Sequence, residues 1–351
     1  MSDKRKLNRQ QQARSERLQQ NRADQAGQSG RDLSANHRTG DLSSAQLGLV
    51  VCRFSKHFEV EALEASHQGR VFKCVARTNL GTLVTGDKVI WKLATDGSGV
   101  IESRLDRRSV LERPDNFGRL KAVAANIDQM VIMIAVQPPP QANLIDRYLV
   151  AAELMQIRPV LVLNKTDLLA APLQSEFDSL LNLYQALGYP VARVISSRHQ
   201  TAMLDQLIPL IKGRTSIIVG QSGVGKSSMI NALLPEHDIA VGALSEQSGE
   251  GTHTTTTARL FHLPDGGQLI DSPGIRDFGL WHIEPEQLQY GFIEIAQQVG
   301  HCKFRDCQHN SEPGCAVLAA VQAGTISEQR FNSFVSIKAS IKEQHARGLG
   351  G

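Results

Sequence analysis

The sequence lacks any apolar run long enough to cross a bilayer, which takes about 20 residues in a helix. Charged residues occupy the N-terminus, and the apolar core of a secretory signal is missing there. Cysteine is scarce: of five residues, two are isolated and three lie close together, a distribution unlike a disulfide framework. These absences predict a reduced, cytoplasmic protein without a membrane partner.

Residues 1–40 have almost no aliphatic side chains and few acidic ones. They contain nine Lys or Arg and four Asp or Glu, an excess of five positive charges, whereas the net charge of the whole chain is +3. Such a segment cannot bury enough apolar surface to offset its ordering entropy, which predicts disorder. It is either a solubilising tail or, as we favour, an arm that binds a polyanion such as RNA.

Residues 41–112 alternate short strands with turn residues. Five β-branched or aromatic segments are expected to be strands: 48–54, 58–63, 70–77, 87–93 and 99–104. This number of short strands is typical of a small Greek-key barrel of the OB type, which here would bind RNA. Cys52 and Cys74 fall within strands and are expected to be buried core thiols. Four arginines at the end of this region form either a solvated charged face or a nucleic-acid contact: Arg104, Arg107, Arg108 and Arg113.

Residues 113–280 change to an alternation of strands and helices, which predicts an α/β domain with a mostly parallel sheet. The expected strands are 127–136, 159–163, 191–195 and 216–219, and the expected helices are 144–156, 176–187, 202–211 and 228–234. Residues 281–351 again have helical apolar spacing, around a cluster of Cys and His residues. The sequence therefore predicts a multidomain chain with a barrel, an α/β domain and a C-terminal helical domain.

A phosphate-binding loop is predicted between the strand at 216–219 and the helix at 228–234. Its residues match G-x-x-x-x-G-K-[ST] and are Gly220, Gln221, Ser222, Gly223, Val224, Gly225, Lys226 and Ser227, with Ser228 next to them. The glycines let backbone N–H groups point at phosphate oxygens, and the helix N-terminus adds a favourable field. Lys226 would bridge the β- and γ-phosphates, and the Ser227 hydroxyl would bind Mg²⁺. The alternative is a glycine-rich turn with an exposed lysine.

A second phosphate-side motif, Asp271-Ser-Pro-Gly274, follows an apolar run and so lies at the carboxyl end of a strand, where α/β sheets bind ligands. Asp271 would hold Mg²⁺ through water, and the Gly274 N–H would contact the γ-phosphate. A plain turn would explain the tetrapeptide if it stood alone, but not beside a phosphate loop.

The guanine base would be recognised by Asn164-Lys165-Thr166-Asp167, which follows the strand at 159–163. The Asp167 carboxylate can accept hydrogen bonds from guanine N1–H and the 2-amino group, and adenine offers no such pair. Asn164 would connect this loop to the phosphate loop, and the Lys165 stem would cover the ring. The dipeptide Ser196-Ser197, after the strand at 191–195, is placed to donate a backbone N–H to guanine O6.

The order of these motifs is permuted relative to ordinary GTPases. There the phosphate loop comes first, then D-x-x-G, then N-K-x-D, whereas here N-K-x-D precedes the phosphate loop and D-x-x-G comes last. The same sheet can be built from a chain that is opened at a different surface loop. As a consequence, the γ-phosphate-sensing segments lead directly into the C-terminal domain.

A structural Zn²⁺ site is predicted from three cysteines and one histidine: Cys302, Cys307, His309 and Cys315. Three thiolates and one imidazole within a short segment suit a closed tetrahedral site. His301 is the rival histidine ligand. Reduced cysteines beside a surface histidine are the alternative to a metal site.

The chain as a whole resembles the bacterial ribosome small-subunit-dependent GTPase A family of circularly permuted GTPases. The likeness includes the basic tail, the barrel, the permuted motifs and the C-x4-C-x-H-x5-C domain, with Leu83-Val-Thr-Gly-Asp87 and Gly251-Thr-His-Thr-Thr-Thr256 as further matches. The resemblance implies a late assembly factor of the 30S subunit. Such a protein would bind 16S rRNA, hydrolyse GTP slowly and be stimulated by the subunit.

The position after D-x-x-G, where many GTPases carry a water-orienting Gln, holds Ile275, which cannot hydrogen-bond water. His253, in the threonine-rich segment, could align the attacking water instead; otherwise it is an exposed loop residue. Among the neighbouring threonines we favour Thr255 as the Mg²⁺ ligand. Two rival functions are a nucleotide-gated RNA-binding scaffold and a metabolic GTPase with a small-molecule substrate. We expect a monomer that binds GTP and GDP.

Overall fold

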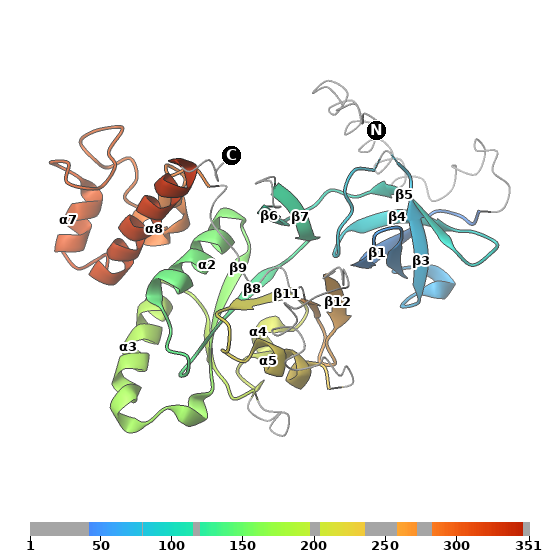
Figure 1. Cartoon of the computed structure of the whole chain (residues 1–351), viewed down its shortest axis with the longest axis horizontal. Coiled ribbons are helices and arrows are strands. Elements are labelled where there is room, and N and C mark those ends of the chain that lie inside the picture. Colours follow the sequence, from blue (N-terminus) through green and yellow to red (C-terminus); the bar gives the residue numbers. More distant parts are fainter. Residues whose placement is uncertain are drawn as a thin grey trace, which may run out of the picture. The chain divides into compact units, whose positions relative to one another are not determined.

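The computed structural model describes residues 42–78, 80–114, 120–196, 204–235, 258–271 and 283–346 (Figure 1). The predicted disorder of residues 1–40 lies outside this part of the chain. The described residues form two compact units. The first contains residues from 1–110, 122–126 and 254–261, and the second contains the others. Each unit is described by itself below.

The first unit is a closed five-stranded barrel, as the sequence predicts. Its strands are β1 (Gln46–Arg53), β2 (Phe58–Ala62), β3 (Val71–Ala76), β4 (Lys88–Leu93) and β5 (Gly99–Arg104), with the short helix η2 (Ala65–His67) before β3. Strand β1 pairs antiparallel with both β2 and β4, β2 pairs with β3, and β5 lies between β3 and β4. The ring of pairings is complete, so none of the five is left as an edge strand.

The centre of the barrel is filled by Trp91, which is fully buried. The backbone at Gly99 lies so close to the indole ring that only glycine fits there. A Cβ added at Gly99 would lie 2.8 Å from the ring and 2.3 Å from the Cys74 Sγ. Cys52 and Cys74 are buried, as expected for core thiols. Burial raises the pKa of the Cys74 thiol to about 12, so this sulfur stays protonated and unreactive.

The Leu83–Asp87 segment is buried and directly precedes β4. The fully buried Asp87 carboxylate forms a bidentate ion pair with Arg107, at 2.7 and 2.8 Å. The Arg107 side chain is therefore mostly covered and held in a structural ion pair. The Thr85 hydroxyl donates to the Ala258 carbonyl at 2.7 Å, immediately before β12 (Arg259–His262). That strand, which sequence reasoning missed, is antiparallel to β1 through Cys52 and Arg259.

Two further strands that the sequence did not predict, β6 (Val110–Pro114) and β7 (Leu120–Ala125), follow the barrel. The sheet of the second unit consists of β8 (Gln129–Ala135), β9 (Arg158–Asn164), β10 (Val191–Arg193), β11 (Thr215–Gly220) and β13 (Gln268–Asp271), in the order β10-β9-β8-β11-β13. Every neighbouring pair for which a register is defined is parallel. The predicted buried strands thus form one parallel sheet.

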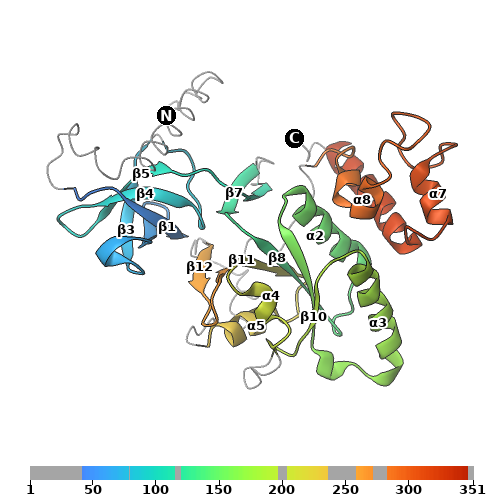
Figure 2. The same ribbon diagram turned by 180° about the vertical axis from the view of Figure 1, so that it is seen from behind.

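Helices cover both faces of this sheet. They are α2 (Ala142–Leu154), α3 (Ala171–Ala186), α4 (Ile208–Ile211) and α5 (Lys226–Leu233). Figures 1 and 2 show α2 and α3 on one face and α4 and α5 on the other. The helix expected at 202–211 is wrong in length, since only 208–211 are α-helical among the described residues 204–211. Pro209 explains this, because proline fits only the first turn of a helix.

The C-terminal helices pack against α2. They are η6 (Leu288–Gly291), α6 (Ile293–Ala296), α7 (Ala316–Gln322) and α8 (Glu328–Ala346). Their apolar core contains Phe292 and Phe334, whose rings meet edge to face at 5.6 Å, and it extends to Val150 on α2. The C-terminal helices therefore share one apolar core with the α/β part of the second unit.

A buried ion cluster strengthens this junction. Arg330 on α8 is fully buried and donates to Asp146 on α2 at 2.6 Å and to both carboxylate oxygens of Glu294 at 2.6 and 3.1 Å. Tyr184 on α3 donates to the same Asp146 carboxylate at 2.8 Å. The guanidinium also lies 4.4 Å from the centre of the Phe292 ring. Burial raises the pKa of Asp146 and the Arg330 charge opposes that shift.

Candidate nucleotide site and metal centre

The segments predicted to bind a nucleotide all lie at the carboxyl edge of the parallel sheet. Asn164 ends β9, Ser196 follows β10, Gly220 ends β11 and Asp271 ends β13. The chain runs outward from β8 through β9 to β10 on one side, and from β11 to β13 on the other. The strand order therefore reverses between β8 and β11, and ligands of open α/β sheets bind at such a switch point.

The phosphate loop connects β11 to α5, as the motif predicts. Gly225 precedes the helix with a left-handed φ of 97°, and a Cβ there would lie 2.4 Å from the Asn164 Nδ2. Lys226 is almost buried, and its Nζ donates to the carbonyls of Gly220 at 2.6 Å and Gln221 at 2.7 Å. The same turn and first helical residues contain Ser222, Gly223, Val224, Ser227 and Ser228. The N-terminus of this helix points its first N–H groups at the loop, an arrangement that favours an anion.

The base-recognition loop is joined to the phosphate loop by a buried side chain. Asn164 Nδ2 donates to the Val224 carbonyl at 2.8 Å and to the Ser196 Oγ at 2.7 Å. Its Oδ1 accepts from the Ser196 backbone N–H at 2.9 Å. One fully buried amide therefore fixes three loops relative to each other, two of which the sequence assigns to the base and one to the phosphates.

Lys165 adds a second connection. It adopts a left-handed φ of 58°, and its Nζ donates at 2.8 Å to the carbonyls of Gly223 and Gln137. Thr166 and Asp167 form the short helix η3 (Thr166–Leu168), where Asp167 is exposed. The exposed Asp167 carboxylate next to Lys165 is available to a ligand that enters from solvent.

Asp271 is partly buried at the end of β13. Four other predicted residues lie outside the described part of the chain: Ser197, His253, Thr255 and Gly274.

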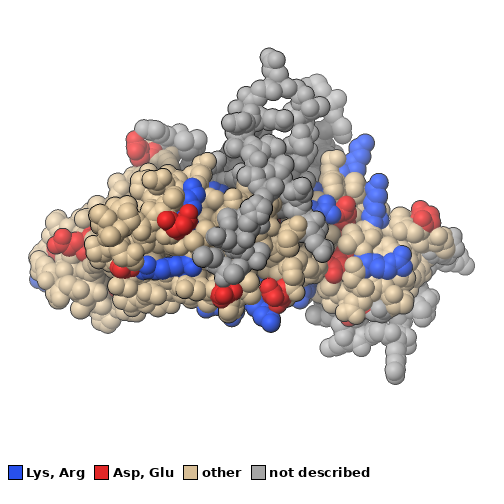
Figure 3. All heavy atoms as spheres, turned by 90° about the horizontal axis from the view of Figure 1, so that it is seen from below, with Lys and Arg blue, Asp and Glu red and all other residues tan. Residues whose placement is uncertain are grey.

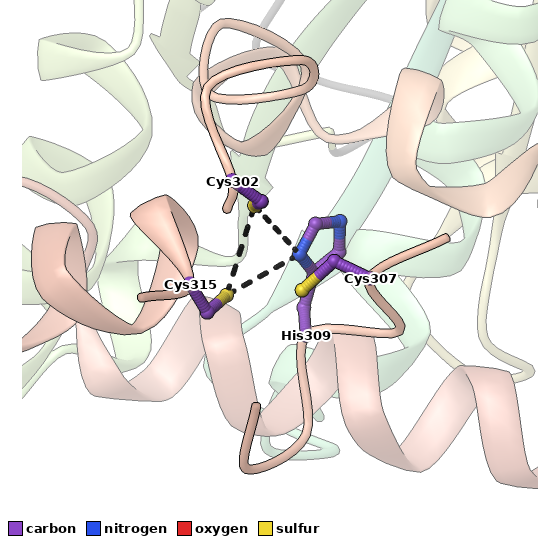
Figure 4. A group of neighbouring side chains, drawn as sticks. All are labelled: Cys302, Cys307, His309 and Cys315. Carbon is purple, nitrogen blue, oxygen red and sulfur yellow. Dashed lines mark hydrogen bonds between the residues drawn. The ribbon is translucent and has the colours of Figure 1, made fainter. Parts of the chain in front are cut away.

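The four predicted metal ligands converge (Figure 4). The ligand atoms of Cys302, Cys307, His309 and Cys315 lie within 4.8 Å of one another. The Cys302 and Cys315 sulfurs are 3.9 Å apart, and the His309 Nδ1 lies 3.6 and 3.4 Å from them. Zn–S bonds of about 2.3 Å in a tetrahedron put sulfurs about 3.8 Å apart, so the donor set fits zinc. The rival ligand His301 is absent from this group.

The loop that carries His309 is held by two groups that sequence reasoning missed. The Glu312 carboxylate accepts from the backbone N–H groups of Gln308, Asn310 and Ser311, which holds its pKa at about 2. The buried Lys338 donates to the Gln308 carbonyl at 2.9 Å. Burial and the nearby Lys338 lower the pKa of His309, which favours the neutral imidazole that binds metals.

Comparison with known proteins agrees with this geometry. A model of the RsgA GTPase family matches residues 104–281. A relative from Marinobacter nauticus, named small ribosomal subunit biogenesis GTPase RsgA, is 49% identical over 346 residues, with 99% of each chain covered. A relative of the same name from Pseudomonas fluorescens SBW25 is 52% identical over 340 residues, with 97% of this chain and 98% of its own covered. The chain belongs to the RsgA GTPase family.

Solved structures of related proteins share the fold. YjeQ from Thermotoga maritima is 31% identical with a TM-score of 0.69, covering 85% of this chain and 98% of its own. YloQ, described as a circularly permuted GTPase, is 29% identical with the same TM-score, covering 89% and 99%. The permuted order that the motifs predict is therefore that of a known GTPase architecture.

No helix in the described part of the chain is long and apolar enough to span a membrane.

Other features of the site had weak sequence signals or none. The Gln137 carbonyl that meets Lys165 could not be found from sequence, because a backbone acceptor has no residue signature. Lys338 and Glu312 look like surface charges, and only the fold shows that they hold the metal loop.

Proposed function

We propose that this chain hydrolyses GTP as a late assembly factor of the small ribosomal subunit, binds 16S rRNA and is stimulated by the subunit. The relatives from M. nauticus and P. fluorescens carry the name of small ribosomal subunit biogenesis GTPases. The observation that carries the nucleotide part is the Asn164 amide, which bonds to Val224 at 2.8 Å and to Ser196 at 2.7 Å. It sets a fixed distance between the base loop and the phosphate loop.

The described residues support separate roles for the base loop, the phosphate loop and the Mg²⁺ ligands. Asp167 pairs with guanine N1–H and the 2-amino group, while Lys165 covers the base. The phosphate loop wraps the phosphates with its N–H groups, and Lys226 turns from its carbonyl partners to the β- and γ-phosphates. Ser227 and Asp271 would hold Mg²⁺, which would neutralise charge on the phosphates.

The remaining catalytic assignments come from the sequence alone. Thr255 completes the Mg²⁺ shell, Gly274 contacts the γ-phosphate, and His253 orients water in place of the Gln that Ile275 displaces. Replacing His253 with Ala should lower kcat far more than it weakens binding of a non-hydrolysable GTP analogue, because a water-aligning group acts in the transition state. Unchanged turnover would return His253 to the role of an exposed loop residue.

The metal is proposed to be one structural Zn²⁺ in the Cys302, Cys307, His309 and Cys315 set. We also propose the division into a tail (1–40), an OB-type RNA-binding domain (41–112), a GTPase domain (113–280) and a zinc domain (281–351). The protein would act as a monomer in the cytoplasm, where ribosomal subunits are assembled.

Affinity for rRNA is proposed to depend strongly on the basic tail. On the face drawn in Figure 3, the described Lys and Arg side chains are interspersed with Asp and Glu. Residues 1–40 carry an excess of five positive charges, which would attract the phosphate backbone. Six to ten phosphate contacts lose about 10³–10⁵ in affinity between 50 and 200 mM salt. Deleting residues 1–40 should flatten the salt dependence of 30S co-sedimentation, and an unchanged slope would make the tail only a solubilising segment.

The test of the enzyme is GTP turnover with and without purified 30S subunits. Strong stimulation supports the proposed function, whereas GTP-dependent 30S binding without stimulated turnover would favour the passive RNA-binding scaffold. Co-sedimentation should be stronger with a non-hydrolysable GTP analogue than with GDP. Equal binding with both nucleotides would exclude a nucleotide switch.

The base pocket has its own test. Asp167→Asn should move specificity from GTP toward XTP, because xanthine has a carbonyl where guanine has its 2-amino group and an amide can donate to it. A variant that hydrolyses GTP normally and ignores XTP would show that Asp167 does not read the base.

A further inference from the structure

We propose that Gln289 is a positioning residue of the metal centre: its amide oxygen accepts the Nε2 proton of His309 and so directs the Nδ1 of that ring to the metal. The His309 Nε2 lies 3.0 Å from the Gln289 Oε1, on the side of the ring opposite the two sulfurs. This inference rests on the proposed zinc site.

The ring nitrogens of His309 have different tasks. Nδ1 lies among the sulfurs and must carry a lone pair to bind a cation, so in a neutral imidazole the proton is on Nε2. A proton at Nε2 needs an acceptor, and a glutamine oxygen supplies one. If the Gln289 amide were turned to donate instead, the proton would move to Nδ1 and block coordination. The orientation of one amide is thereby linked to metal binding.

Burial makes this acceptor important. His309 is 3% exposed, so water cannot readily replace a lost partner. A buried N–H without an acceptor is strongly unfavourable. His309 also has a left-handed φ of 60°, an unfavourable conformation for a non-glycine residue. The ring therefore needs a hydrogen-bond partner at Nε2. The contacts of Glu312 and Lys338 hold the loop that carries His309, and not the ring itself.

Gln289 is well placed to hold it. It belongs to η6, where its neighbour Leu288 is fully buried in the core shared with Val150 of α2. Residue 289 comes from the segment between Asp271 and the metal loop, and not from the metal loop itself. Gln289 consequently connects the metal centre to the chain that leaves the predicted D-x-x-G motif.

The test compares three variants of the full chain. Gln289→Leu keeps the side-chain size and removes the acceptor, Gln289→Glu keeps an acceptor, and Gln287→Leu changes an exposed glutamine two residues earlier. Zn²⁺ affinity is measured by chelator competition, and the visible spectrum of the Co²⁺-substituted protein reports ligand geometry. Removal of such an outer partner typically lowers metal affinity about 10–100-fold. We expect that loss for Gln289→Leu, with a changed Co²⁺ spectrum, and near-normal values for the other two.

The possible results separate this inference from the zinc proposal. If the unaltered protein binds no Zn²⁺, the metal site itself is wrong. If it binds Zn²⁺ and Gln289→Leu stays within about twofold of Gln287→Leu, Gln289 does not position His309. Should Gln289→Leu fail to fold, the Glu variant decides: an affinity about tenfold or more below that of the unaltered protein would also overturn the inference.

Discussion

Replacing Arg330 with Met is expected to cause one of the largest losses of stability available to a single substitution in this chain. The guanidinium makes three hydrogen bonds to two carboxylates with no exposed surface of its own. Methionine fills part of the volume and keeps contact with Phe292, but it leaves Asp146 and Glu294 facing each other without a cation. Since burial already raises the pKa of Asp146, this carboxyl should take up a proton in the variant.

The magnitude follows from breaking a buried ion pair by removing one partner, which costs about 3–5 kcal/mol. A unit of this size shifts its melting temperature by about 2–4 °C for each kcal/mol, so the expected decrease is roughly 6–20 °C. The melting temperature should decrease for the second unit, which contains the parallel sheet and the C-terminal helices. The barrel transition should stay in place, because no barrel residue takes part in the described cluster.

Differential scanning calorimetry of the full chain measures this shift. The matched control is Arg193→Met, whose ion pair with Asp178 is partly exposed on both sides and should contribute little. Adding Asp146→Asn to Arg330→Met should cost less than the two single changes summed, because the partners interact directly. If Arg330→Met were no more destabilising than Arg193→Met, the buried cluster would not hold the two parts together.

Three more predictions concern other sites. Gly225→Ala should weaken GTP binding at least about tenfold in a fluorescent-nucleotide titration, because its Cβ would meet the Asn164 amide at 2.4 Å; unchanged affinity would refute that packing. Gly99→Ala should destabilise the barrel by about 1–3 kcal/mol in urea unfolding, since its Cβ would overlap Trp91, and an unshifted midpoint would contradict the model of the core. Removing the metal with a chelator should lower the melting temperature of the second unit and leave the barrel unaffected; a metal-independent melting curve would count against a structural site.

The sequence by itself determined the barrel strands, the buried strands of the parallel sheet and the chemistry-bearing motifs. The five barrel strands, the buried strands of the parallel sheet and the phosphate loop were predictable because each depends on local spacing: alternation in strands, glycines before Lys226, and turn residues between elements. The metal ligands were predictable for the same reason, since all four lie within one short segment. The permuted order of the motifs needed only their positions along the chain.

Only the tertiary structure decided which distant residues meet. The helix expected at 202–211 failed because apolar spacing overestimated it and Pro209 restricts it to one turn. Strand β12 was missed because four residues give little periodic signal, and its pairing with β1 comes from a distant part of the chain. The sequence placed Arg107 in a charged group and gave no signal for Arg330 or Gln289. The fold places each of them against partners 20 or more positions away. Burial makes these contacts specific, because an unpaired charge or N–H in the core costs far more than one in water.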